Sequence, residues 1–79
     1  MREKTLKLVV TFATTADALA MESLGRTGGV PGRIIPVPSQ IDSGCGLAWC
    51  VEASQKEDLL RGISQYGVAY EGFYEVMLY

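Results

Sequence analysis

Two stretches of strand-like sequence each run directly into a helix-like stretch, and this order limits the folds open to a chain of 79 residues. From Leu6 to Phe12, apolar side chains recur at every second position, which is typical of a strand with one apolar face. A helix should follow, since Thr14 and Thr15 offer capping hydroxyls and Asp17 places an acid in the first turn.

The first helix should end at Gly28-Gly29, because glycine commonly ends helices. Small and apolar residues at helical spacing predict the stripe that this helix buries, namely Ala16, Leu19, Ala20 and Leu24. A short strand is predicted next, over residues 32–37. Pro36 and Pro38 place it at a sheet edge, because proline has no amide to donate to a neighbouring strand.

The second strand–helix unit begins with a strand predicted over residues 47–51. The helix after it should start with a capping box at residues 54–57 and end at Gly67. Its apolar face is predicted to consist of Leu59, Leu60 and Ile63. Residues 69–78, rich in tyrosine, phenylalanine and valine, predict the last strand.

The order strand–helix–strand–strand–helix–strand predicts an α+β fold of the ferredoxin-like type, a four-stranded antiparallel sheet with two helices on one face. We expect a single domain over residues 1–79. In this topology the first and second strands are parallel, and the third lies antiparallel between them. The loop before the third strand should therefore lie at the same end of the sheet as the start of the first helix.

Composition and charge argue against several classes of function. A net charge of −2 gives no basic surface for nucleic acid or an anionic membrane, and no apolar run approaches the roughly 20 residues that span a bilayer. The first residues do not form a secretory signal, so we expect a cytoplasmic protein. Two cysteines without histidine do not supply a four-ligand zinc site, and no phosphate-binding glycine motif occurs. We expect neither a metal nor a cofactor.

The segment 43–50 holds both cysteines, and Cys45 is the stronger candidate for chemistry. It lies between Gly44 and Gly46, which leave the sulfur little side-chain cover and suggest a loop open to solvent. The expected topology brings it near Thr14 and Thr15, where the free amides and partial positive charge of a helix start favour a thiolate. The loop amides could add a small anion-binding nest. A turn residue without function is the alternative.

Cys50 is expected to be a small buried core residue of the third strand. Five extended residues span roughly 16 Å, whereas a disulfide needs Cα atoms within about 7 Å. An extended segment would therefore prevent a Cys45–Cys50 bond, although a tight loop would allow one. A redox pair is also disfavoured, because its usual motif has two residues between the cysteines.

Four segments together resemble the Se/S carrier-like family of small bacterial domains. They are TFATTADA at 11–18, GVPGRIIPVP at 29–38, SGCGLA at 43–48 and YEGFYE at 70–75. The resemblance covers nearly the whole chain. It implies a carrier of selenium or sulfur in which the cysteine of the SGCGLA segment, Cys45, accepts the atom.

The resemblance and the residues together predict a carrier that holds a persulfide or selenosulfide on Cys45, with Gly44, Gly46, Thr14 and Thr15 around the anion. Its partners would be proteins that donate and accept sulfur or selenium, and a homodimer is compatible with the sequence. We expect a carrier or binding domain rather than an enzyme. The alternative is a non-enzymatic interaction or regulatory module of the same fold, in which Cys45 is incidental.

Overall fold

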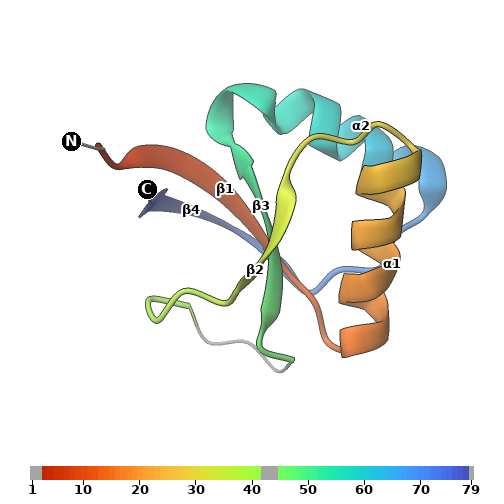
Figure 1. Cartoon of the computed structure of the whole chain (residues 1–79), viewed down its shortest axis with the longest axis horizontal. Helices are drawn as coiled ribbons and strands as arrows, with labels where there is room; N and C mark the ends of the chain where they lie inside the picture. The colour runs from red at the N-terminus through yellow and green to blue at the C-terminus, as the bar shows by residue number, and fades with distance from the viewer. Residues whose placement is uncertain (1–2, 42–44, 79) are drawn as a thin grey trace.

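The computed structural model describes residues 3–41 and 45–78. It contains one four-stranded sheet in the order β2-β3-β1-β4, with every neighbouring pair antiparallel and both helices on one face (Figure 1). The elements are β1 (Thr5–Thr11), α1 (Thr15–Thr27), β2 (Arg33–Pro36), β3 (Leu47–Glu52), the short 3-10 helix η1 (Ala53–Gln55), α2 (Lys56–Tyr66) and β4 (Gly72–Leu78). The predicted ferredoxin-like α+β fold is confirmed.

Alternation along the two central strands divides the molecule into two apolar layers. Alternate residues of β1 and β3 turn towards the helices, and Val10 lies opposite Trp49 in the register. The helix-side core consists of Leu8, Val10, Phe12, Ala18, Met21, Val30, Trp49, Val51, Leu59 and Ile63. A smaller cluster on the other face joins Val9 and Ala48 to Ile41, which comes from the segment after β2. The sheet is therefore partly covered on its second face as well.

Helix α1 starts and ends where the sequence predicts, but it buries a different face. The Thr14 hydroxyl accepts the Asp17 amide at 3.2 Å, and the Gly28 amide donates to Leu24 O at 2.7 Å. The predicted stripe is wrong in that Ala16, Leu19 and Ala20 are exposed, Leu19 by 51%.

The buried face of α1 runs through Ala18, Met21 and Gly25 instead, spaced three and four residues apart. A Cβ built on Gly25 would lie 2.4 Å from the Trp49 ring. The helix is thus rotated so that its smallest residue meets the largest side chain of the sheet, an arrangement that a count of apolar residues alone does not favour.

Helix α2 does not use the predicted capping box. The chain first forms η1, so the N-cap falls on Gln55, whose side chain makes no capping hydrogen bond. Gly67 ends the helix in the left-handed conformation, with φ 67°, as predicted. Leu59 and Ile63 are buried, whereas Leu60 is 37% exposed.

The predicted edge position of the proline-containing strand is confirmed, since β2 pairs with β3 alone. β4 forms the other edge and pairs with β1 over its full length, from Thr5 opposite Leu78 to Thr11 opposite Gly72. Within residues 3–41 and 45–78, no helix has the length and apolarity needed to cross a bilayer.

We predict that Gly25→Ala lowers the free energy of unfolding by about 1–2 kcal/mol, since overpacking against Trp49 outweighs the better helix propensity of alanine. Denaturant unfolding of both proteins measures the difference. Ser23→Ala, at an exposed position of the same helix, serves as the control and should leave stability nearly unchanged. A Gly25→Ala protein as stable as wild type would contradict the close approach of α1 to Trp49.

Candidate functional site

Cys45 lies two residues before β3, at the end of the sheet where β1 finishes. Thr11 is opposite Ala48, and Pro36 is opposite Leu47, so the end of β1, the end of β2 and the start of β3 meet there. Helix α1 begins at the same end, because it follows β1 directly (Figure 1). This confirms the expectation that Cys45 and the start of the first helix lie at the same end of the sheet.

The backbone at Gly46 turns the sulfur of Cys45 back onto the chain. Gly46 has φ 79°, in the left-handed region that favours glycine. The Sγ atom of Cys45 then lies 3.5 Å from the Leu47 amide, which donates to it, and 3.4 Å from Leu47 O, which accepts its proton. The Gly46 carbonyl accepts the Val37 amide at 3.0 Å, which ties this turn to the segment after β2.

The Cys45 side chain is half-buried between solvent and the helix-side core. It packs against the cluster that lies under α1 and α2. The neighbouring Gly46 is exposed, and a Cβ at that position would meet nothing within 4 Å. The Cys45 side chain thus rests on apolar groups, and the glycine that follows it is open to solvent.

The other residues expected around Cys45 have different positions. The Thr14 hydroxyl is occupied as the cap of α1, and Thr15 is the exposed first residue of that helix. Between Cys45 and these two threonines, all of them described residues, no hydrogen bond is formed. Gly44 lies outside the described residues. The contact of the Leu47 backbone with the Cys45 sulfur was not predicted from the sequence. Gly46 could have indicated it, because a glycine after the cysteine allows the chain to turn back.

Cys50 belongs to the opposite face of the sheet. It is 5% exposed and lies between Val9 of β1 and Arg33 of β2 in the register, so the expectation of a buried strand residue is confirmed. Both cysteines are free thiols. Burial raises the pKa of the Cys50 thiol, and the charges of Lys7 and Arg33 offset part of that rise.

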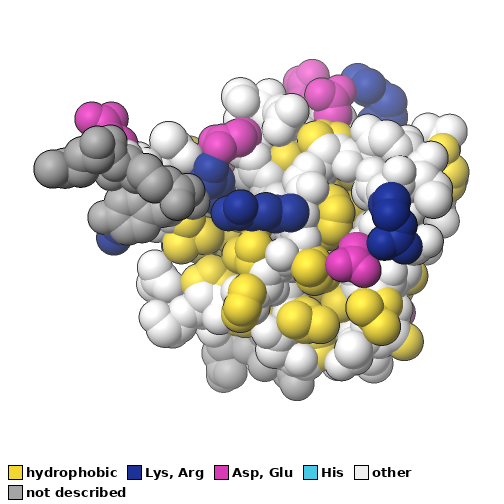
Figure 2. Space-filling model, in the orientation of Figure 1, with side chains coloured by type: hydrophobic (Ala, Val, Ile, Leu, Met, Phe, Trp, Pro, Cys, Tyr) yellow, Lys and Arg dark blue, Asp and Glu magenta, His cyan; other side chains and the backbone are white. Residues whose placement is uncertain are grey.

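A cavity of about 290 Å³ adjoins Cys50. It is lined by Lys7, Gly32, Arg33, Cys50, Val51, Glu52 and Gln55. Figure 2 shows charged side chains of both signs beside a group of hydrophobic side chains on the face that it presents. The cavity combines basic, acidic and amide groups, and it was not anticipated because its residues come from separate segments.

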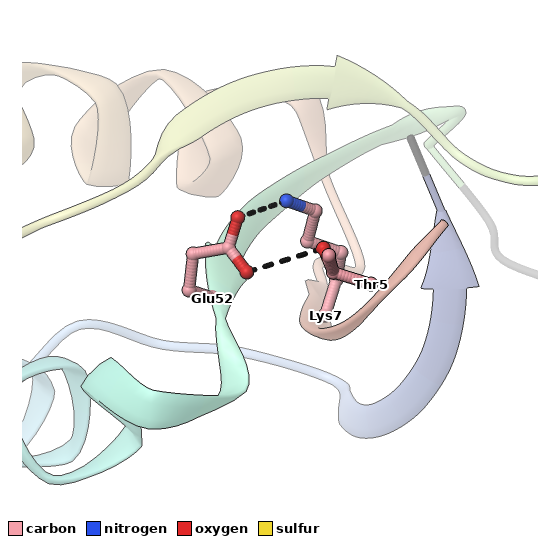
Figure 3. A network of polar contacts seen from close by, with 3 residues as sticks. All are labelled: Thr5, Lys7 and Glu52. Atoms are coloured by element: carbon pink, nitrogen blue, oxygen red, sulfur yellow. Dashed lines mark hydrogen bonds and ion pairs between the residues drawn. The ribbon is translucent and has the colours of Figure 1, made fainter. Parts of the chain in front are cut away.

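The Glu52 carboxylate joins Lys7 and Thr5 of β1 in a small polar network (Figure 3). Lys7 lies directly opposite Glu52 in the register and forms an ion pair with it, while the Thr5 hydroxyl donates to Glu52 at 3.3 Å. The hydrogen bond from Lys7 lowers the pKa of the Glu52 carboxyl. Most of the basic charge of Lys7 is thereby neutralised at the rim of the cavity.

Comparison with known families matches residues 7–75 to the family described as "Putative Se/S carrier protein-like". The chain belongs to this family. The match runs from Lys7 within β1, past Cys45, to Glu75 within β4. No curated protein and no solved structure matched the chain. The family thus supports a role in carrying selenium or sulfur.

We predict that iodoacetamide modifies Cys45 in the native protein and modifies Cys50 only after denaturation. Cys45 is half-buried beside an exposed glycine, whereas Cys50 is buried and its raised pKa leaves less thiolate. Peptide mass spectrometry after timed alkylation measures both rates in one sample. Equal native rates, or faster modification of Cys50, would contradict the assignment of the two faces.

We predict that Glu52→Gln lowers the thermal midpoint at neutral pH and that the difference from wild type shrinks in acid. The folded-state pKa of Glu52 is lowered, so its stabilising effect is present above the unfolded-state pKa of about 4.3 and is lost as pH falls through the lower folded value. Glu71→Gln, at an exposed position just before β4, is the matched control. A difference that stays constant from neutral to acid pH would show that the carboxylate charge is not responsible.

Proposed function

We propose that this protein carries a sulfur or selenium atom on Cys45, as a persulfide or selenosulfide, between a donor protein and an acceptor protein. The observation that carries the proposal is the glycine turn at Cys45, which holds a half-buried thiol at an end of the sheet with space beside it. The family match over residues 7–75 supports the same role.

Loading is a displacement at sulfur. The Cys45 thiolate attacks the terminal sulfur of a donor persulfide, the Cys45–sulfur bond forms, and the donor's own thiolate leaves. Delivery repeats the step, since an acceptor nucleophile attacks the terminal sulfur and releases the Cys45 thiolate. Each transfer moves one sulfur atom without an external oxidant or reductant. A selenium atom in the terminal position follows the same balance.

The residues around Cys45 have distinct roles in this proposal. The Leu47 carbonyl accepts the proton of the resting thiol, and once that proton has left, the Leu47 amide donates to Sγ and stabilises its negative charge. The core beneath the side chain limits its motion and shields one side from water. The exposed Gly46 admits the donor's sulfur. Thr14 and Thr15 contribute backbone amides near the same end of the sheet, which favour an anion there.

Incubation with a small-molecule persulfide, followed by intact-protein mass spectrometry, tests the proposal. The wild-type protein should gain the mass of one sulfur atom, and a reducing thiol should reverse the gain. The Cys45→Ala protein should gain nothing, and the matched variant Cys50→Ala should load like wild type. Loading that persists in Cys45→Ala, or that is lost in Cys50→Ala with the fold intact, would rule out Cys45 as the acceptor.

Gly46→Ala and Gly29→Ala together distinguish an effect of the Cys45 turn on loading from the loss of stability that any alanine in the left-handed conformation causes. Gly46 and Gly29 have φ values of 79° and 73°, and a Cβ at either position meets nothing within 4 Å. Alanine at each costs roughly 1–2 kcal/mol in backbone conformation. Gly46→Ala should slow loading, because it disturbs the contact between Sγ and Leu47, whereas Gly29→Ala should lower stability alone. Equal loading in both variants would remove the turn from the mechanism.

A further inference from the structure

The outer edge of β4 has no partner strand among the described residues. β4 is the last strand in the order β2-β3-β1-β4, and its inner edge pairs with β1 over seven positions. A strand in that place presents a row of free amides and carbonyls along its other side. Such a row is complementary to another extended strand.

The two edges of the sheet differ in how they are protected. β2 has four residues, contains Pro36, and carries Arg33 at its start. Proline and basic side chains are common means of blocking edge-to-edge pairing. β4 has seven residues, with no proline and no basic residue, and Glu75 is its single charge. The β2 edge of the sheet is therefore protected against pairing with another strand, whereas the β4 edge is not.

Large apolar side chains are exposed beside the open edge. Met77 of β4 is 49% exposed, and Leu6, which lies opposite it on β1, is 41% exposed. Tyr74 is 40% exposed and belongs to the other face of the sheet, beside Val9 in the register. The helices pack mainly over β2 and β3 and leave this side of the sheet less covered. An added strand would bury apolar surface on both faces of β4.

We propose that the open edge binds a second copy of this chain, through antiparallel pairing of β4 with β4 of the copy about a two-fold axis. A two-fold contact uses one surface on both copies and closes at two subunits. An unguarded strand that carries a single charge suits this pairing, which in the register assigned below joins residues 74–78 of each copy, and the product is one continuous eight-stranded sheet. Cys45 precedes β3, which β1 separates from β4, so both thiols stay clear of the contact.

Glu75 fixes which register is favourable. A two-fold axis at Glu75 would place the two carboxylates opposite each other, which is destabilising. An axis at Val76 places Glu75 opposite Met77 of the copy and Tyr74 opposite its Leu78. These pairs join apolar and aromatic side chains on one face and separate the charges on the other. We therefore assign the axis to Val76.

Sedimentation over a range of protein concentrations tests the dimer. The wild-type protein should dimerise, and the double variant Tyr74→Lys/Leu78→Lys should raise the dimer dissociation constant by about tenfold or more, since each new lysine faces a lysine of the copy in this register. Leu19→Lys is the matched control, because Leu19 is 51% exposed on α1, away from the edge. Circular dichroism checks each fold. A monomeric wild type, or equal weakening by Leu19→Lys, overturns the proposal.

Cysteine crosslinking tests the register independently. In a Cys45→Ala/Cys50→Ala background, Val76→Cys should oxidise rapidly to a covalent dimer, because a residue on the axis meets its own copy. Glu75→Cys, one position away, should crosslink more slowly. Faster crosslinking through Glu75→Cys would overturn the Val76 axis, and no crosslinking through either would overturn pairing along β4. Both results are independent of persulfide loading at Cys45.

Discussion

The fit of the Trp49 indole between two glycines is the packing constraint on which the rest of the fold depends. A Cβ at Gly25 of α1 or at Gly32 before β2 would lie 2.4 Å or 2.3 Å from the indole. The indole nitrogen donates to Pro31 O at 2.9 Å, so the ring is fixed in position and its polar atom is satisfied. One side chain thus sets how closely α1 and the chain before β2 approach β3.

This constraint extends to both cysteines, because they flank Trp49 on the same segment. With Trp49 directed towards the helices, Cys50 must face the other side of the sheet, next to Arg33 and Lys7. Cys45 precedes the strand, and the turn at Gly46 returns its sulfur to the helix side. The two thiols therefore have different surroundings. Cys45 lies on a turn at one end of the sheet, whereas Cys50 lies within β3 and lines the same cavity as the Lys7–Glu52 ion pair.

Much of the fold is predictable from the sequence because its signals are local. The Thr14 cap and the glycines at 28 and 67 depend on near neighbours and are confirmed, and the predicted apolar face of β1 is confirmed except at Leu6, which is 41% exposed. The buried face of α1 is not predictable in this way, since Trp49 determines it from another element. The capping box failed because η1 shifts the helix start to Gln55.

The candidate site also contains features that are local in the sequence and features that depend on contacts between distant residues. The sequence singles out Cys45 as a candidate and predicts a turn at its glycine neighbours, and the left-handed conformation of Gly46 is a local property of that kind. The cavity beside Cys50 and the Lys7–Glu52 pair depend on the strand register, which brings together residues 45 positions apart. Gly46 indicates a turn, whereas the hydrogen bond from the Leu47 amide to the sulfur depends on how that turn packs and is not predictable from the sequence.

Trp49 is the single tryptophan of the chain, and it is 3% exposed with its indole hydrogen-bonded. Its emission therefore comes from one defined place, the junction of α1, β2 and β3. The protein carries an intrinsic optical probe of its helix–sheet contact, four residues along the chain from the thiol of Cys45. A binding event that changes the packing at this junction can therefore be followed by tryptophan fluorescence in unlabelled protein, in the same sample in which sulfur is loaded.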